Sequence, residues 1–264
     1  MNFGKGMMTG FSFDLSGRVA LVTGASSGLG RRFALILAAS GAKVVIGARR
    51  VALLEVLADE IAAAGGEALP VALDVTDEAS IIAAYDAAAD RFGPIDTVIA
   101  NAGLNVAGSA LGLAAEAFDR MVAVNLRGVF LTVREGARRM IAAGSVERGH
   151  GRITIISSIT AHQPAAGIAP YSATKAAVAQ MGRSLARDWA MKGINVNILC
   201  PGYVATEMNE AIWDAPSGQS LLASFPRRRV MEEDALDPMI LYLSSDLSSP
   251  ITGSVITADD GQTL

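Results

Sequence analysis

Apolar runs rich in valine and isoleucine alternate, along most of the 264-residue chain, with longer segments in which apolar residues recur with helical period. The short runs are typical of strands buried on both faces, and the alternation predicts strand–helix–strand units around a parallel sheet. The predicted strands cover residues 18–23, 43–48, 68–73, 95–100, 152–157, 194–199 and 254–257. The predicted helices cover residues 28–40, 51–64, 78–92, 114–143, 169–191 and 232–244.

The connections between these elements predict where a binding crevice lies. Right-handed crossovers would place the first six strands in the order 3-2-1-4-5-6, with a crevice beyond their carboxyl ends. The residues with distinctive chemistry that follow a predicted strand are Gly24, Asp74, Asn101, Ser158 and Pro201. We therefore expect these residues to meet at one crevice.

Length, charge and composition narrow the class of protein. A chain of this length can bury about three quarters of its unfolded surface as one domain, so no second domain is required. The net charge is −4 and the longest basic cluster is the three arginines at 227–229, which argues against a nucleic-acid surface. The single cysteine, Cys200, excludes an internal disulfide and favours a reducing compartment. Neither His150 nor His162 has a cysteine or acidic residue at ligand spacing, so no metal site is predicted.

The ends and one long loop complete the expected domain organisation. Residues 1–14 lack the continuous apolar stretch of a secretory signal and are interpreted as an arm before a domain at 15–264. No run approaches the ~18 apolar residues of a membrane span, so we expect a cytoplasmic protein. The long irregular segment 206–229 is expected to be a lid over the crevice.

A tyrosine and a lysine four residues apart provide the most specific chemical signal. On a helix, Tyr171 and Lys175 lie one turn apart on the same face, and Ser158 precedes the tyrosine by thirteen residues. A neighbouring ammonium lowers the pKa of a phenol from its ordinary value of about 10, which makes it a better proton carrier. Taken alone, the pair also fits an ordinary half-exposed helix face.

A glycine-rich turn follows the first predicted strand. Gly24, Gly28 and Gly30 stand where that strand gives way to a helix, and glycines there let a pyrophosphate approach the amides of the helix N-terminus. The spacing differs from the commoner Gly-x-Gly-x-x-Gly, and no Gly-Lys-Ser/Thr follows, which argues against a nucleoside-triphosphate loop. The turn predicts a dinucleotide site, and the alternative is an ordinary tight turn.

Together these motifs resemble the short-chain dehydrogenase/reductase family in its compact, non-extended form, over residues 15–264. The resemblance implies an α/β, single-domain, Rossmann-type doubly wound parallel sheet with about seven strands in the order 3-2-1-4-5-6-7 and helices on both faces. The residues that match the family's catalytic tetrad are Asn125, Ser158, Tyr171 and Lys175. The positions that match its cofactor-binding motifs are Gly24, Ser26, Ser27, Gly28, Leu29, Gly30, Asp74, Val75, Asn101, Ala102, Gly103, Tyr171, Lys175, Pro201, Gly202, Val204 and Thr206.

The resemblance assigns a role to each member of the tetrad. Tyr171 exchanges a proton with the alcohol or ketone oxygen, and Ser158 hydrogen-bonds the same oxygen. Lys175 lowers the pKa of Tyr171 and holds the nicotinamide ribose. Asn125 links Lys175 to a water chain.

Three of these positions also have a purely structural interpretation, and one has a neighbouring alternative. Asn125 could belong to a helix kink, and Asp74 could cap the helix that follows it. Thr206 could cap a lid helix, and Ser157 is the alternative to Ser158 as the catalytic serine.

The end of the second predicted strand bears on cofactor choice. Ala48 occupies the place where an acidic side chain would bind the adenosine ribose, and Arg49 can pair with a 2′-phosphate, with Ser27 adding a hydroxyl. The sequence therefore favours NADP over NAD, which remains possible. In the alternative interpretation Arg49 and Arg50 are solvated residues at the start of a helix.

The resulting hypothesis is an NAD(P)-dependent oxidoreductase, a carbonyl reductase or alcohol dehydrogenase, that transfers hydride between nicotinamide C4 and a ketone or secondary alcohol. One alternative is a 3-oxoacyl-thioester reductase acting on an acyl carrier protein, with the arginines at 227–229 as the docking patch. A remote alternative is a non-catalytic dinucleotide-binding regulator, against which the complete tetrad argues.

Substrate and assembly are less determined. The residues expected to line the substrate pocket are Asn105, Val106, Thr160, His162, Tyr203, Met208, Ile212 and Trp213. An apolar lid favours a hydrophobic small-molecule substrate. The resemblance implies a homotetramer, with a dimer next, built on the helices at 114–143 and 169–191 and on the tail. The tail reads Ala-Asp-Asp-Gly at 258–261 where the family more often has Val-Asp-Gly-Gly.

Overall fold

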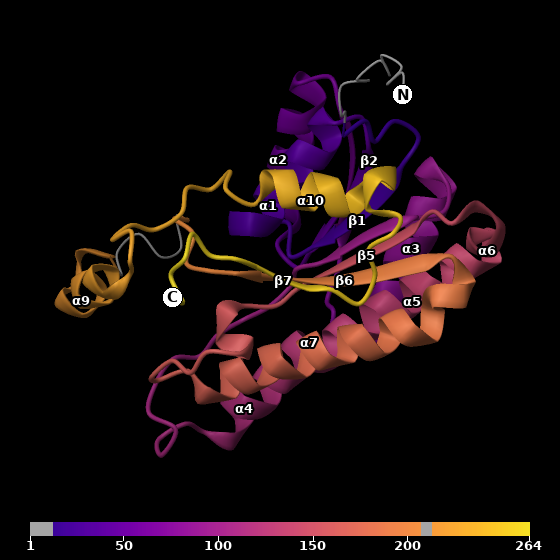
Figure 1. Ribbon diagram of the computed structural model, residues 1–264. Coiled ribbons are helices and arrows are strands. Elements are labelled where there is room, and N and C mark those ends of the chain that lie inside the picture. Colours follow the sequence, from indigo (N-terminus) through magenta and orange to yellow (C-terminus); the bar gives the residue numbers. More distant parts are fainter. Residues whose placement is uncertain (1–12, 207–212) are drawn as a thin grey trace, which may run out of the picture.

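Seven parallel strands form the central sheet of the computed structural model, in the order β3-β2-β1-β4-β5-β6-β7 (Figure 1). The structure describes residues 13–206 and 213–264. The strands are β1 Val19–Thr23, β2 Lys43–Ala48, β3 Glu67–Ala72, β4 Thr97–Ala100, β5 Gly151–Ile156, β6 Ile194–Pro201 and β7 Val255–Ala258. The predicted α/β fold and strand order are confirmed, and each predicted strand lies within two residues of an observed one at both ends.

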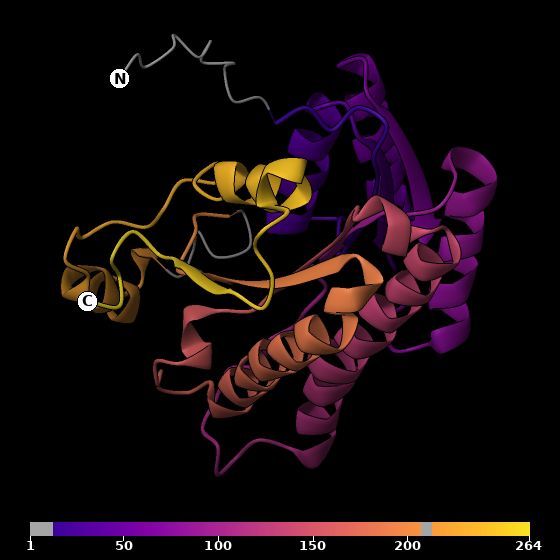
Figure 2. The same cartoon turned by 45° about the vertical axis from the view of Figure 1, so that its right-hand side comes forward.

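Helices cover both faces of the sheet. One face carries α1 Gly28–Ala39, α2 Val51–Ala63 and α10 Asp237–Ser244 (Figure 1). The other carries α3 Glu78–Phe92, α4 Ala115–Val122, α5 Val129–Ala142 and α7 Ala169–Trp189, with α7 lying alongside α4 and α5 (Figure 2). Two further helices, α6 Ser145–Arg148 and α9 Pro216–Ser224, lie outside these layers.

The apolar core is divided by the sheet into two clusters. Alternate residues of β1 contribute to opposite sides, because Leu21 belongs to the α3/α5/α7 cluster and Val22 to the α1/α2/α10 cluster. Val22 also pairs in register with Ile46 of β2 and Ile99 of β4, and all three are fully buried. Burial on both faces explains why these strands read as continuous apolar runs.

Two predicted helices differ from the observed ones. The helix expected at 114–143 is interrupted by a π-helical segment, Ala123–Gly128, between α4 and α5. The helix expected at 232–244 begins at Asp237, because Leu236 caps it and Pro238 follows at a position where a missing N–H costs nothing. The preceding residues form turns.

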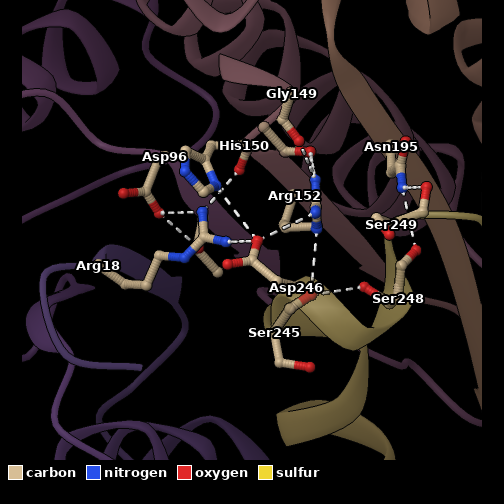
Figure 3. Close-up of polar contacts among 12 residues, drawn as sticks. Arg18, Asp96, Gly149, His150, Arg152, Asn195, Ser245, Asp246, Ser248 and Ser249 are labelled. Atoms are coloured by element: carbon tan, nitrogen blue, oxygen red, sulfur yellow. Dashed lines mark hydrogen bonds and ion pairs between the residues drawn. The ribbon is translucent and has the colours of Figure 1, made fainter. Parts of the chain in front are cut away.

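At the amino ends of the strands, one carboxylate joins three basic side chains (Figure 3). Asp246 pairs with Arg18, just before β1, and with Arg152 of β5, whose Nη2 lies 3.4 Å from its Oδ1. The Nδ1 of His150 lies 3.2 Å from the same oxygen. Both guanidinium groups are almost completely buried, whereas 66 % of the Asp246 side chain is exposed. The segment after α10 is thereby fastened to β1 and β5.

A second carboxylate, Asp96, borders this group. Its Oδ1 lies 3.7 Å from Nη1 of Arg18, and it also accepts hydrogen bonds from the Thr97 hydroxyl and the Val19 amide. Burial raises the pKa of Asp96 above its ordinary value, against the opposing effect of the Thr97 hydrogen bond and the Arg18 charge. Every carboxylate and guanidinium in this group therefore has a partner, as buried ionic groups require.

Within 13–206 and 213–264, no helix is both long and apolar enough to cross a membrane. The same residues contain no cluster of three or more His, Cys, Asp or Glu side chains arranged to hold a metal ion.

Candidate active site

The turn between β1 and α1 depends on glycine because of close backbone approaches. Gly24 has a φ of +70°, and a Cβ there would lie 2.9 Å from the Cα of Ala102. A Cβ at Gly30 would lie 2.3 Å from the carbonyl oxygen of Gly24. Side chains at either position would push the turn away from β4 and α1. The sequence Thr23–Gly30 therefore folds into a compact loop whose last residues begin a helix.

This loop is tied to the loop after β4. The Thr23 hydroxyl accepts hydrogen bonds from the Asn101 and Ala102 amides at 3.1 and 3.0 Å, and the Asn101 side-chain amide donates to the Thr23 carbonyl at 3.0 Å. Asn101 and Ala102 thus hold the loops after β1 and β4 together. Thr23 was not singled out from the sequence, and its position at the last residue of a buried strand is the signal that identifies it.

A cavity of about 480 Å³ opens between these loops at the carboxyl ends of the strands. Of the residues proposed from the sequence, those that line it are Gly24, Ser27, Gly28, Leu29, Gly30, Asn101, Ala102, Gly103, Ser158, Tyr171, Lys175, Pro201, Gly202, Val204 and Thr206. An adjoining cavity of about 220 Å³ is lined by Ser26, Arg49, Asp74 and Val75, among others. Asn125 lies just behind Gly103, where a Cβ would be 3.5 Å from its Oδ1.

The two cavities have the features that a dinucleotide requires. Gly28, at φ +52°, begins α1, and a Cβ there would have its nearest contact, Thr206, at 3.9 Å, so its backbone faces open space. The Ser27 cap leaves the first amides of α1 without a side-chain partner, which makes this helix end suitable for a pyrophosphate. Adenosine and nicotinamide would then lie in the smaller and larger cavity respectively. The residues present fit such a cofactor.

Arg50 makes the polar contacts that define the wall of the smaller cavity. Its guanidinium donates to the Ser26 hydroxyl at 2.9 Å and to the Ser27 hydroxyl at 2.7 Å. The sequence favoured Arg49, which lines the same cavity and whose charge contributes to lowering the pKa of Asp74. The two arginines are adjacent in the sequence, and sequence alone did not single out Arg50 as the one that bonds these serines.

Asp74 lines the smaller cavity rather than capping the next helix. Its Oδ1 accepts from the Thr76 amide at 2.9 Å and from the Thr76 hydroxyl at 2.7 Å, and these two bonds hold the pKa of Asp74 below its ordinary value. The cap of α3 is Asp77, which accepts from the Ala79 amide at 3.0 Å.

Tyr171 and Lys175 share one face of α7, toward the larger cavity. The Lys175 ammonium lies 5.5 Å from the centroid of the Tyr171 ring and donates to the Ile156 carbonyl at 2.9 Å. The cation is therefore placed beneath the ring and fixed to β5. Asn125 comes close to the same region because its Nδ2 donates to the Leu104 carbonyl and to the Thr174 hydroxyl.

Asn125 is both part of a helix irregularity and part of the site. It is fully buried in the π-helical segment, and its Oδ1 accepts from the Leu104 amide at 2.8 Å. The extra residue in this turn directs the side chain toward the loop after β4, a common use of π-helical turns. The two interpretations of Asn125 left open by the sequence are thus compatible.

The serines at the end of β5 have different surroundings. The buried Ser157 hydroxyl donates to the Lys175 carbonyl at 2.8 Å, which joins β5 to α7. The Ser158 hydroxyl accepts from the amide and hydroxyl of Thr160, each at 3.1 Å, and its interaction with the Tyr171 phenol acts to lower the pKa of that phenol. Of the two serines, Ser158 is the one that reaches the phenol.

The pKa shifts in this site differ from the sequence-based expectation. Burial raises the pKa of Tyr171 above its ordinary value, the Ser158 hydrogen bond opposes that shift, and the nearby Tyr203 adds to it. Burial also lowers the pKa of Lys175 to about 8. The net shift of the Tyr171 pKa is therefore upward, opposite in direction to the lowering expected from Lys175. At neutral pH both groups hold their protons.

The segment expected to be a lid is described in part. Met208 and Ile212 lie outside the described residues, Thr206 lines the larger cavity, and Trp213 contacts Tyr203. The helix α9 occupies the middle of this segment.

Other expected pocket residues divide into two groups. Asn105, Thr160 and Tyr203 line the larger cavity, whereas Val106 and His162 are not among its described lining residues. The cavity is also lined by Leu104, Ile159 and Ile168, which the sequence did not single out.

The arginines proposed as a carrier-protein docking patch make contacts within the chain. Arg227 and Arg229 both pair with Asp260, at 3.0 and 2.7 Å. This contact joins the segment after α9 to the tail. Arg228 has a positive φ of 50°.

Comparison with known proteins places these features in a family. The model of the short chain dehydrogenase family matches residues 18–217. Gluconate 5-dehydrogenase of Gluconobacter oxydans is 36% identical over 253 residues, which cover 96% of this chain and 97% of that protein. Cis-4-hydroxycyclohexanecarboxylate dehydrogenase of Sinomonas cyclohexanicum is 38% identical, covering 93% and 96%. The crystal structure of a gluconate 5-dehydrogenase from Burkholderia cenocepacia in complex with NADP and tartrate is 35% identical, with a TM-score of 0.88 over 95% of this chain and 97% of that one.

Proposed function

This chain belongs to the short-chain dehydrogenase family of oxidoreductases, and we propose that it catalyses the reduction of a ketone to a secondary alcohol in both directions, with NADP as cofactor. The observation that carries the proposal is the convergence of Tyr171, Ser158 and Lys175 on one cavity that also contains the glycine turn. The bound nicotinamide would supply or accept the hydride. The remaining chemistry is a proton transfer at the substrate oxygen, which the chain's own side chains perform.

Tyr171 is the proposed proton donor in the direction of reduction. A phenol with a raised pKa stays protonated at neutral pH, so it is ready to protonate an alkoxide as negative charge develops. Ser158 would donate a second hydrogen bond to the same oxygen and stabilise that charge. The Lys175 ammonium would stabilise the phenolate that remains, and Asn125 would help to position Lys175 through the Leu104 loop.

We propose that the 2′-phosphate of NADP binds between Arg49 and Arg50. Both arginines line the smaller cavity, and Ala48 leaves no carboxylate at the end of β2 to repel the phosphate. Guanidinium groups bind phosphate through charge-assisted hydrogen bonds. The NADP complex of the Burkholderia cenocepacia relative supports this choice.

The 3-oxoacyl-thioester alternative has less support. It requires a free basic patch for an acyl carrier, and Arg227 and Arg229 are engaged by Asp260. The assembly also remains a proposal, and the family resemblance favours a homotetramer.

The proposed function is tested by assaying the purified protein with a panel of ketones and secondary alcohols and with both NADPH and NADH. Formation or consumption of the reduced cofactor is followed by its absorbance. Turnover of at least one ketone, faster with NADPH, supports the proposal. Cofactor binding without turnover of any ketone or alcohol, including polyols and sugar acids, would favour the non-catalytic alternative.

Arg50→Ala is expected to weaken NADPH binding about tenfold or more and to change NADH binding less than about threefold. The reason is the loss of a charged hydrogen bond worth about 1.5–3 kcal/mol, made only to the 2′-phosphate. Titration of cofactor fluorescence measures both affinities. Arg49→Ala tests the neighbouring arginine in the same way, and Arg91→Ala, an exposed arginine at the far end of α3, is the matched control. Equal weakening of both cofactors by Arg50→Ala would remove this residue from phosphate recognition.

The rate of ketone reduction is expected to be nearly constant from about pH 6 to pH 7 and to fall at higher pH, with a midpoint near the Lys175 pKa of about 8. Tyr171 has a raised pKa and Lys175 one of about 8, so both are protonated at neutral pH and Lys175 is the first to lose its proton. Loss of that ammonium removes the charge that stabilises the Tyr171 phenolate. A pH–kcat profile at saturating NADPH measures this dependence. A fall centred below pH 7 would assign the titration to another group.

A further inference from the structure

A cluster of three aromatic side chains includes one that lines the larger cavity. Tyr203 lines the cavity, its ring meets Trp213 edge to face at a centroid distance of 5.5 Å, and it stacks on the buried Phe225 at 5.6 Å. We call Tyr203, Trp213 and Phe225 the aromatic wall. A ring held between two others presents an apolar surface of fixed orientation.

The backbone of Tyr203 is held by the end of the chain. Its amide donates to Oε1 of Gln262 at 2.7 Å, and Nε2 of Gln262 donates back to its carbonyl at 3.0 Å. Gly202 allows this approach, because a Cβ there would lie 2.4 Å from the same Oε1. The Met231 amide also donates to the Tyr203 carbonyl. The backbone that carries the Tyr203 ring is therefore fixed by contacts with Gln262 and Met231.

The charges of the cavity are as informative as its shape. Among the described lining residues there is no Asp, Glu, Arg or His, and the sole basic one is Lys175, whose ammonium is fixed beneath Tyr171. The hydroxyl side chains of Ser158 and Thr160, which also line the cavity, are uncharged. A substrate carboxylate would have no cationic partner on the described surface, and an unpaired charge is costly to desolvate.

The lining between these groups is aliphatic. Leu104, Ile159 and Ile168 line the same cavity as Tyr171 and Tyr203. A substrate bound there exposes its oxygen to Tyr171 and Ser158 and its hydrocarbon body to apolar side chains.

Building on the proposed function, we infer that the substrate is an uncharged ketone or secondary alcohol with a cyclic hydrocarbon body, and that Tyr203 selects it by packing against that body. The contact removes apolar surface from water at about 25 cal/mol per Å². Tyr203 acts on binding and orientation, and proton transfer belongs to Tyr171.

The charge part of the inference is tested with a matched pair of ketones, 4-methylcyclohexanone and 4-oxocyclohexanecarboxylate, with NADPH. We expect kcat/KM to be at least about tenfold higher for the neutral ketone, since a desolvated and unpaired carboxylate costs more than the 1.4 kcal/mol that a factor of ten represents. Equal or faster turnover of the carboxylate would overturn the inference and leave the proposed function intact. If no ketone or alcohol were turned over, the proposed function itself would be wrong.

The role of Tyr203 is tested with a large and a small neutral ketone. Tyr203→Ala should lower kcat/KM for 4-methylcyclohexanone about tenfold or more, chiefly through KM, and change that for acetone less than about threefold, because acetone does not span the cavity. Tyr203→Phe should retain the activity with the cyclic ketone, since the ring remains.

The comparison separates packing on substrate from general damage to the fold. A structural defect would lower both ketones and the NADPH affinity together, and that outcome with Tyr203→Ala would overturn the assignment. Tyr242→Phe, at a tyrosine of α10 outside the cavity lining, is the control that should leave all three measurements unchanged.

Discussion

Tyr171→Phe is expected to lower kcat for ketone reduction by about a hundredfold or more, because the variant keeps the ring and loses the proton. General acid catalysis is worth about 10² to 10⁴-fold, and Tyr171 is the titratable hydroxyl that Ser158 contacts within the cavity. NADPH affinity should change less than about threefold, since the ring contact with Lys175 remains. Steady-state assays and a fluorescence titration measure the two quantities.

A matched control addresses loss of a hydroxyl in general. Tyr242→Phe removes a phenolic oxygen outside the cavity and should leave kcat unchanged. Ser158→Ala should reduce kcat less than Tyr171→Phe does, because a hydrogen bond to the oxyanion is lost while the proton source remains. If Tyr171→Phe retained more than about a tenth of the activity, the proton would have to come from another group or from water.

Asp246→Ala is expected to lower the free energy of unfolding by about 3 kcal/mol, which is the lower end of the range for breaking a buried ion pair. The variant leaves the buried guanidinium groups of Arg18 and Arg152 without their shared carboxylate. We choose the lower end because Asp246 itself is largely exposed and Arg152 keeps hydrogen bonds to the Gly149 and Ser245 carbonyls. For a chain of this size the midpoint of thermal unfolding should fall by about 6 to 12 °C.

Glu60→Ala provides the comparison for a surface ion pair. Glu60 pairs with Arg31, and each side chain is 44 % exposed, so its loss should cost less than about 1 kcal/mol. Differential scanning calorimetry of both variants at the same protein concentration gives the two shifts. Similar shifts for Asp246→Ala and Glu60→Ala would mean that the buried arginines are solvated or find other partners.

The sequence was sufficient to predict the sheet because burial on both faces leaves a direct record in the chain. Val44, Val45 and Ile46 are apolar because residues on both sides of β2 enter a core cluster, and handedness then orders the strands. The cofactor turn was equally predictable, since a Cβ at Gly24 or Gly30 would lie only 2.9 or 2.3 Å from neighbouring backbone atoms, so both positions require glycine.

Features that depend on distant contacts were not predictable. The local pattern at Asn125 allowed a helix kink, but it did not predict that the Asn125 side chain would bond the backbone of Leu104. The contact of Arg50 with Ser26 and Ser27 depends on how the β2–α2 loop leaves the sheet. The direction of the Tyr171 pKa shift depends on burial, which outweighs the opposing effect of Ser158.

The ion pairs that join the start of β1 and the helix α1 to α10 and the segment after it have a consequence for synthesis on the ribosome. Arg18 pairs with Asp246, and Arg32 pairs with Asp237, so partners separated by more than 200 residues must both have emerged from the exit tunnel. Until β7 is available, β6 presents an open edge, and the buried Arg18 and Arg152 lack their shared carboxylate, Asp246. The fold is therefore completed only after residue 246 has been synthesised and has left the tunnel, and a nascent chain stalled before that residue would be a substrate for chaperones rather than a partly active enzyme.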